Sequence, residues 1–446
     1  FDTGMHYIGS AEPGQVLHTI YHYLGIDSDI RLSRLDPMGY DVISYQGEHY
    51  RLANGKENFI DALSAQFPKS RDELNKYYDL IKTVASSWEI HSLRRDVDLN
   101  VNAEFQMRSV NEVVDSIISD PVLRQVLVGI QPLYAGIKDH TPFSTHALIY
   151  DFYNQSAYRI VGGSSLVADS LANSIRRMGG QVLVKKKATK IECDHKKATA
   201  VLTDTGERFP ADLVISAIHP ALTVQLIDSH LIRPSYRERV LNVPNSISAF
   251  TVYLKFRENS VPYMDKNLYI YRGDSIWGCE KYDDTSWPKF ILYMHFCHED
   301  NPVFARSGEI LTYMNFSDVQ QWCGTHIGQR GESYEMFKKR KAEEAIDVLE
   351  KEIPGIRDHI EEYYTSSPLT YQDYTGIPDG AMYGISKDVQ SIVSGSVTSR
   401  TKIPNLLLSG QCITLHGMLG VLAGSLATCS EVLTIDEIFR QLKHAE

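Results

Sequence analysis

The stretch LLLSGQCITLHGMLGVLAGSLATCSEVL, residues 406 to 433, has the residue types and spacing to hold an electron-rich ligand. We expect an apolar strand ending at Gly410 and a helix rich in small residues starting near Gly417. Free N–H groups and the dipole at a helix N-terminus favour an electron-rich atom. An ordinary buried strand–helix unit with a tightly packed helix has the same pattern, so both interpretations stay open. The small residues are Gly417, Gly420, Ala423, Gly424 and Ala427.

A second stretch, IVGGSSLVADSLANSIRRMGGQVLV from residue 160, predicts a loop, a helix and a strand. It is followed by KATKIECDHKKATAVLTDTGERFPADLVISA, which predicts a β-meander finished by a buried strand, LVISA. A small α/β layer without a ligand is the alternative. The two α/β pieces are separated by one helical and one strand-rich insert, as in a discontinuous nucleotide-binding domain carrying a substrate domain.

The remaining elements must position these stretches. Apolar spacing predicts helices over 14–25 and through 57–155, with short strands in 38–52 around Gly47. Alternation predicts several strands in 246–318. A long helix over 333–353 is expected to stop at Pro354-Gly355, and a last one to run from about Met418 to Lys443.

Composition narrows the classes of protein. The 446 residues have a formal net charge of -11 and no long basic stripe, so we expect no nucleic-acid partner. No window approaches eighteen uninterrupted apolar residues, the length that spans a membrane. The six cysteines form no CxxC pair, so no metal site is predicted and a reducing cytoplasm is the simplest compartment. Peripheral membrane contact and a homodimer stay open as further partners.

Together with FDTGMHYIG at residues 1 to 9, the two stretches resemble the FAD-dependent phytoene desaturase, carotenoid isomerase and retinol saturase family of amine-oxidase-like flavoproteins. SPLTYQDYTGIPDGAMYGI, residues 367 to 385, is also similar to that family, and the resemblance covers essentially the whole chain. It implies an oxidoreductase that uses FAD on an apolar small-molecule substrate of the polyene or isoprenoid type. Saturation, desaturation and isomerisation of C=C bonds all fit it.

The resemblance also implies the architecture. The fold class is α/β, with a Rossmann-type FAD-binding domain built from discontinuous segments and a mixed α+β substrate domain. The FAD-binding domain is expected to comprise residues 1–10, 157–235 and 386–446. The substrate domain is expected to comprise residues 11–156 and 236–385.

The family begins with a strand, a GxGxxG turn, a helix and a second strand, which hold the FAD pyrophosphate and ribose. No GxGxxG occurs in these 446 residues. We therefore expect the family without its N-terminal βαβ unit, either through truncation or in a degenerate homologue, and weak or no FAD binding by this chain. A non-catalytic fragment that binds no FAD is one alternative. An amine-oxidase-type flavoenzyme is another, although no aromatic pair or charged anchor for its substrate can be identified.

The cofactor contacts are carried over from the resemblance. Gly410 and Gln411 match positions that contact the ribityl or pyrophosphate portion, and Ala188 a position whose backbone contacts the adenine. The other expected contacts lie beside the dinucleotide, at the N1/O2 edge of the flavin or near its isoalloxazine ring. They are Ser216 and Ala217; Gly417, Met418, Leu419 and Gly420; and Gly4 and Met5.

His6 and His416 are the expected catalytic residues, because the resemblance places both close to the flavin ring. Each could donate a hydrogen bond or a proton to substrate, and a purely structural role for each is the alternative. A set of tyrosines could line a hydrocarbon tunnel or pack a core. These are Tyr363, Tyr364, Tyr371, Tyr374 and Tyr383.

Overall fold

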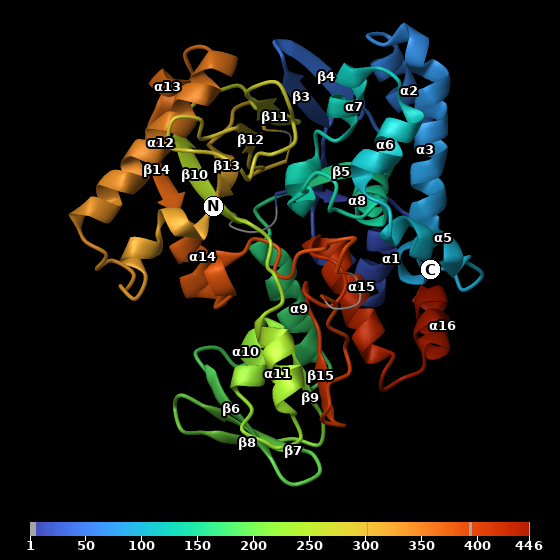
Figure 1. Ribbon diagram of the computed structural model, residues 1–446, viewed down its shortest axis with the longest axis vertical. Helices are drawn as coiled ribbons and strands as arrows, with labels where there is room; N and C mark the ends of the chain where they lie inside the picture. The colour runs from blue at the N-terminus through green and yellow to red at the C-terminus, as the bar shows by residue number, and fades with distance from the viewer. Residues whose placement is uncertain (1–5, 301, 392–394, 446) are drawn as a thin grey trace.

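The computed structural model describes residues 6–300, 302–391 and 395–445. Figure 1 shows a broad upper part, in which a sheet with α12 to α14 lies on one side and most of helices α1 to α8 on the other, and a narrower lower part. The lower part contains α9 to α11 and strands β6 to β9 and β15. Helix α15 lies where the two parts meet.

A seven-stranded sheet dominates the upper part, in the order β14-β10-β13-β12-β11-β3-β4. Neighbouring strands are antiparallel except β11 and β3, which run parallel. The pair β3 and β4 is a tight hairpin in which Gln46 and Gly47 both have positive φ, 53° and 83°. The strands are β3 (Asp41–Tyr45), β4 (Glu48–Leu52), β10 (Ser248–Phe256), β11 (Asn267–Tyr271), β12 (Phe290–His295), β13 (Ser307–Met314) and β14 (Ile360–Ser366).

Both faces of this sheet are covered. Alternate residues of β13 point to opposite faces, so Leu311 and Tyr313 pack with the helical half while Ile310 and Met314 pack with α12 (Glu332–Glu352). The central strands are therefore buried on both sides. The helices of the helical half are α2 (Lys56–Ser64), α3 (Arg71–Ser86), α4 (Glu89–Ser92), α5 (Leu99–Gln106), α6 (Val110–Ile117), α7 (Pro121–Leu127) and α8 (Phe143–Gln155). Two short helices, α13 (Ile356–His359) and α14 (Pro368–Thr375), flank β14.

The lower part contains a three-stranded antiparallel sheet and a separate parallel pair, β15 with β9. The expected meander forms the first of these. Its strands are β6 (Ala188–Cys193), β7 (Ala198–Thr203) and β8 (Arg208–Pro210), and the parallel pair is β9 (Val214–Ser216) and β15 (Leu406–Leu408). Helices α9 (Ser165–Arg177), α10 (Pro220–Gln225) and α11 (Pro234–Leu241) accompany them.

A small three-stranded sheet consists of β1 (Ile8–Gly9), β5 (Ala157–Ile160) and β2 (Leu32–Arg34). Strand β5 is central and pairs antiparallel with both neighbours. Helix α1 (Val16–Tyr23) and helix α15 (Gly417–Cys429) contribute to the apolar cluster that packs against this sheet. Ile8 of β1 thereby packs in one cluster with Leu419 and Leu426 of α15.

Three sequence expectations were wrong. QVLV, residues 181–184, forms no strand. The strand in LVISA is only partly buried: Ile215 is 46% exposed, because β15 is the one strand that pairs with β9 among the described residues. The last helix is broken at 430–434, and α16 (Ile435–Ala445) starts afresh where the Thr434 hydroxyl accepts from the Glu437 N–H.

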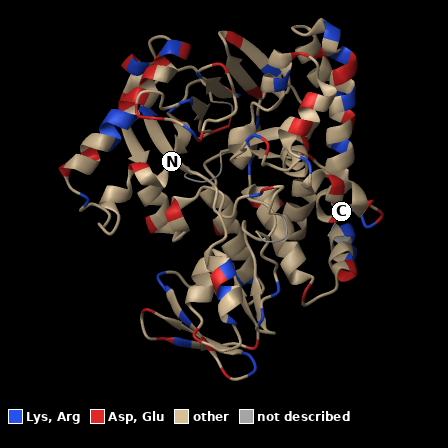
Figure 2. Cartoon of the chain, viewed as in Figure 1, with Lys and Arg blue, Asp and Glu red and all other residues tan. Residues whose placement is uncertain are grey.

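The charged residues lie mainly on the outside. Figure 2 shows acidic and basic residues interspersed along α12 and α3, as expected of solvated helix faces. Within the described residues, no helix combines the length and the apolar character needed to cross a membrane.

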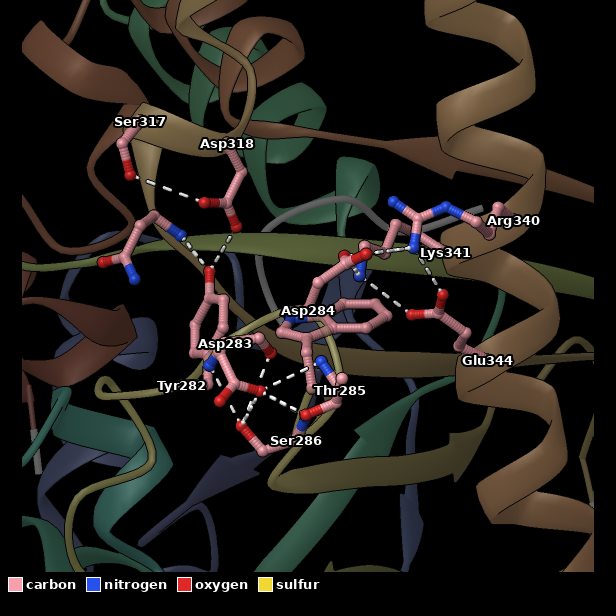
Figure 3. Close-up of polar contacts among 12 residues, drawn as sticks. Tyr282, Asp283, Asp284, Thr285, Ser286, Ser317, Asp318, Arg340, Lys341 and Glu344 are labelled. Atoms are coloured by element: carbon pink, nitrogen blue, oxygen red, sulfur yellow. Dashed lines mark hydrogen bonds and ion pairs between the residues drawn. The ribbon is translucent and has the colours of Figure 1, made fainter.

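One polar cluster fastens the loop 279–289 to α12 (Figure 3). The Lys341 ammonium, whose side chain is only 3% exposed, donates to Asp284 at 2.7 Å and to Glu344 at 2.9 Å. Asp283 accepts from the backbone N–H groups of Thr285 and Ser286, which closes the loop on itself. The donors and acceptors are paired with one another, so this cluster is a structural clamp.

Candidate active site

The parallel pair β9 and β15 brings together two of the expected cofactor-binding stretches. Ser216 ends β9 and Gly410 follows β15, and the Ser409 N–H donates to the Ser216 carbonyl at 2.9 Å. Gly410 has a φ of +93°, and a Cβ there would lie 3.0 Å from the Ala217 carbonyl oxygen. Only glycine fits this close approach. Ligands of open α/β sheets bind outside the carboxyl ends of parallel strands, which is where these residues meet.

Helix α15 begins where the sequence placed it, at Gly417. Gly417 has a φ of +74°, is exposed, and has open space where a Cβ would stand. The side chain of Leu419 is buried in the cluster beside β1, with Met418 packed against it. A Cβ on Gly420 would lie 2.6 Å from the Leu415 carbonyl, so the room beside Gly420 is taken by the preceding loop. The open approach to α15 is therefore at Gly417.

His416 immediately precedes α15 and is held by two contacts. Its Nε2–H donates to the Leu133 carbonyl at 2.6 Å, and its ring stacks on Tyr383 with centroids 3.9 Å apart. Burial lowers the pKa of His416 to about 4, although the bond to Leu133 opposes the shift. Burial also lowers the pKa of the nearby Lys387. His416 is therefore neutral at pH 7, with its only N–H occupied.

The other expected cofactor contacts have different surroundings. Gln411 is half-buried beside Gly410. Ala188 begins β6 and pairs with Thr203, in the lower sheet well below α15 in Figure 1. Gly4 and Met5 lie outside the described residues.

His6 faces a carboxylate that the sequence did not reveal. Its Nδ1 lies 3.3 Å from Oε2 of Glu309, and the two side chains are 13% and 1% exposed. Glu309 lies in β13, on the face that carries Leu311 and Tyr313. A carboxylate this close favours the charged imidazolium of His6. The pair is thus a buried acid–base couple.

The charge of Glu309 raises the pKa of three nearby tyrosines. Burial, followed by the Glu309 charge, raises the pKa of Tyr253 to about 12. Burial raises the pKa of Tyr371 and of Tyr383 further still, with Glu309 contributing to both. Tyr383 stacks on His416, so Glu309 and Tyr383 connect the surroundings of the two expected catalytic histidines.

The five tyrosines that were predicted to line a tunnel or pack a core have different surroundings. Tyr371 hydrogen-bonds Thr251 at 2.6 Å on the inner side of the sheet, and Tyr363 donates to Glu343 of α12. Tyr364 and Tyr374 are exposed. Only Tyr371 and Tyr383 belong to the site.

Behind His6 lies a second buried carboxyl, Asp41. Its Oδ2 accepts from the Tyr7 hydroxyl and its Oδ1 from the Asn267 amide, each at 2.8 Å. Tyr7 also contacts the Tyr269 hydroxyl at 2.8 Å. Burial raises the pKa of Asp41 to about 7, against the effect of both hydrogen bonds. This network fixes Tyr7 and thereby the backbone that carries His6.

Sequence reasoning missed Glu309, Asp41 and the role of Tyr383. The one available signal for Glu309 was a lone acid at the start of the apolar run EILTYM. Within the part of the chain that the structure describes, no group of three or more His, Cys, Asp or Glu side chains could hold a metal ion.

Comparison with known proteins places this geometry in a family. The model of the flavin containing amine oxidoreductase family matches residues 1–328. All-trans-retinol 13,14-reductase of Rattus norvegicus is 28% identical over 97% of this chain and 78% of its own length. Chloroplastic prolycopene isomerase 1 of an Oncidium hybrid cultivar is 23% identical over 81% of this chain and 64% of its own length. These similarities confirm the resemblance drawn from the sequence.

The fold comparison agrees. The crystal structure of an oxidoreductase from Methanosarcina mazei superposes with a TM-score of 0.63 and 14% identity, over 96% of this chain and 90% of that one. At 14% identity the match shows a similarity of fold alone. The fold is the mixed α/β arrangement of amine-oxidase-like flavoenzymes. The chain belongs to the family of flavin containing amine oxidoreductases.

Proposed function

We propose that this protein is an FAD-dependent oxidoreductase that acts on C=C bonds of a long apolar polyene or isoprenoid. The family membership and the retinol reductase and prolycopene isomerase relatives support the flavin and the substrate class. The observation that carries the proposal is the buried pair His6 and Glu309, which lies on the inner face of the large sheet. A buried acid–base pair of this kind can supply or accept the proton that a reaction at a carbon atom requires.

The described residues fit a flavin. The close approach of Gly410 to Ala217 and the open space at Gly417 form an edge without side chains, where a flat cofactor can contact backbone atoms. The N–H groups of Gly417, Met418 and Leu419 would hold the flavin ring, and Gly410, Gln411, Ser216 and Ala217 its ribityl and phosphate portion. When bound, FAD supplies hydride or electron transfer.

His6 then supplies or removes the proton. Saturating a C=C bond adds a hydride to one carbon and a proton to the other, and the imidazolium of His6 donates that proton. Desaturation runs the same transfers in reverse, with neutral His6 as the acceptor. Glu309 stabilises the imidazolium in both directions by its negative charge 3.3 Å away.

His416 has a positioning role. Its Nε2–H is bound to Leu133, and its low pKa leaves it neutral, so it has no proton to donate at pH 7. The stacked pair His416 and Tyr383 instead forms a rigid wall beside the first turn of α15. This wall would fix the cofactor edge against the inner face of the sheet.

The domain assignment follows from the same proposal. Residues 1–10, 157–235 and 386–446 would form the FAD-binding domain, and 11–156 with 236–385 the substrate domain.

Exposed apolar side chains in α9, β9 and the segments next to them favour a homodimer, with peripheral membrane contact as the alternative. They are Leu166, Ile175, Met178, Leu183, Val184, Leu213, Ile215 and Ile218.

The test is reconstitution followed by turnover. The protein is incubated with FAD, the flavin is reduced anaerobically, and all-trans-retinol is added; we expect a product two mass units heavier. Glu309→Gln and His6→Gln should each slow this reaction about 100-fold or more while leaving the bound-flavin spectrum unchanged.

His22→Gln is the matched control, because His22 forms a similar pair with Asp27 at 2.8 Å on the surface. Unchanged rates in both site variants would refute the proton assignment. A wild-type protein that stays colourless with excess FAD would refute the cofactor and favour the non-catalytic alternative.

A further inference from the structure

The loop 272–289, which joins β11 to β12 in the upper part of the molecule (Figure 1), surrounds an open cleft. The cleft has a volume of about 460 Å³. Small-molecule sites in proteins have volumes of about 300–1,000 Å³. The residues that line the cleft are separate from those of the site described above. The cleft is therefore large enough for a ligand that the proposed reaction does not use.

Two cations of this loop stand directly opposite each other. Tyr271 pairs with Phe290 at the end of the antiparallel ladder of β11 and β12. The next pair is Arg272 and Lys289, and the Arg272 N–H donates to the Lys289 carbonyl at 2.8 Å. Directly opposite residues of an antiparallel pair project their side chains to the same face, and like charges there are destabilising. An anion bound between the two side chains would remove this repulsion.

The protein itself does not supply that anion. The Arg272 Nη1–H donates to the Pro288 carbonyl at 3.0 Å, and the Lys289 ammonium donates to the Gly278 carbonyl at 3.5 Å. Neither cation forms an ion pair with a carboxylate of the residues that the structure describes. Both cations line the cleft, and Asp274 is the one carboxylate in its wall. The wall therefore has a net positive charge and unused N–H donors.

Hydrogen bonds to other elements fix the walls of the cleft. Gln125 of α7 accepts from the Ile276 N–H at 2.8 Å. The Tyr45 hydroxyl, at the end of β3, donates to the Asp274 carbonyl at 2.6 Å. The clamp described above holds the other end of the loop to α12. Because the walls are fixed in this way, a ligand would bind with little loss of loop entropy.

We propose that this cleft binds a phosphate monoester of a soluble molecule, with the phosphate group between Arg272 and Lys289. A phosphate monoester carries about two negative charges at neutral pH, and its oxygens accept charge-assisted hydrogen bonds from both cations. A carboxylate would balance only one of them. Trp277 lines the cleft and is 7% exposed, and its indole N–H is a further donor without a partner among the described residues.

The rest of the cleft favours an organic ester of this kind. A free phosphate ion would fill only a small part of the volume, so the remainder accommodates the organic group. The loop 272–289 exposes no large apolar side chain, although an apolar rim is what contact with a membrane would require. We therefore expect a soluble ester and not the head group of a lipid. This inference does not depend on the proposed function.

The test titrates three probes into the protein by calorimetry: phenyl phosphate, phenyl sulfate and inorganic phosphate. Phenyl sulfate has nearly the same shape as phenyl phosphate and one negative charge fewer. We expect the wild-type protein to bind phenyl phosphate about fivefold more tightly than phenyl sulfate, and about tenfold more tightly than inorganic phosphate. Vesicles that contain phosphatidate should bind no better than vesicles of phosphatidylcholine.

Variants of the wall locate the binding. Arg272→Gln and Lys289→Gln should each weaken the binding of phenyl phosphate about tenfold or more. Asp274→Asn should tighten it, because the wall then has no carboxylate, and misfolding cannot produce a gain. Lys281→Gln is the matched control, since Lys281 lies in the same loop but outside the cleft, with a side chain that is 81% exposed.

Equal binding of phenyl phosphate and phenyl sulfate by the wild-type protein would overturn the proposal, and this comparison needs no variant to fold. Inorganic phosphate that binds as tightly as phenyl phosphate would refute the organic ligand. Binding of phosphatidate vesicles that Arg272→Gln abolishes would refute the soluble source. Equal losses in Arg272→Gln and Lys281→Gln would show attraction by the charge of the whole loop and refute the site. Failure to bind FAD would defeat the proposed function alone and leave these comparisons intact.

Discussion

Replacing Asp41 by Asn should change how the stability of the protein depends on pH. Asp41 is fully buried in β3 and accepts hydrogen bonds from Tyr7 and Asn267. Burial outweighs these two bonds and raises the pKa of Asp41 from 3.8 to about 7. Asn keeps nearly the same shape and one acceptor oxygen, but it does not ionise.

The sign follows from proton binding in the two states. Between pH 4 and pH 7 the folded protein keeps the proton on Asp41 and the unfolded chain has lost it, so stability falls as pH rises. Raising the pKa by about three units corresponds to about 4 kcal/mol of folding stability. This stability is lost in full only above the pKa of the folded state. Between pH 5 and pH 8 the wild-type protein should lose about 2–3 kcal/mol from this group alone.

Urea unfolding followed by intrinsic fluorescence at pH 5 and pH 8 measures this effect. The stability of Asp41→Asn relative to the wild-type protein should rise by about 2–3 kcal/mol from the lower to the higher pH. Asp79→Asn, on a 61% exposed side chain, should show almost no such change. A difference between Asp41→Asn and wild type that is the same at both pH values would refute the reasoning.

Further predictions concern the core, the cofactor edge and the clamp. Burial lowers the pKa of His146 to about 3, so the unfolded chain takes up a proton below pH 6.5 that the folded protein cannot. His146→Gln should therefore remove about 3 kcal/mol of the stability loss between pH 7 and pH 4 in urea titrations. Gly417→Val should weaken the binding of added FAD, measured by titration of flavin fluorescence, whereas Gly328→Val, at a similar φ of +73°, should not. Lys341→Met should lower the free energy of unfolding by about 1–3 kcal/mol, because the Lys341 ammonium is buried and bonds two carboxylates. Lys338→Met should lower it by less. Equal losses in the two variants would contradict the clamp.

Local pattern determined much of this protein by itself. The Gln46-Gly47 turn, the helix that ends before Pro354-Gly355 and the start of α15 at Gly417 are set by backbone preferences of a few adjacent residues. The sequence was therefore sufficient to predict them. The family resemblance likewise depends on short stretches, and it was confirmed by comparison.

The tertiary structure alone decided the chemistry of the site. In sequence, Glu309 is a lone acid before the apolar run ILTYM, and a lone acid is ordinarily solvent-exposed. It is buried because the helical half covers that face of the sheet, which brings His6 from a remote segment to within 3.3 Å. Asp41 lies in β3 of the same sheet, on the face that carries Ile43 and Tyr45, and the helical half buries it as well. Burial and long-range pairing depend on how distant segments pack, and residue types in a linear pattern do not specify that packing.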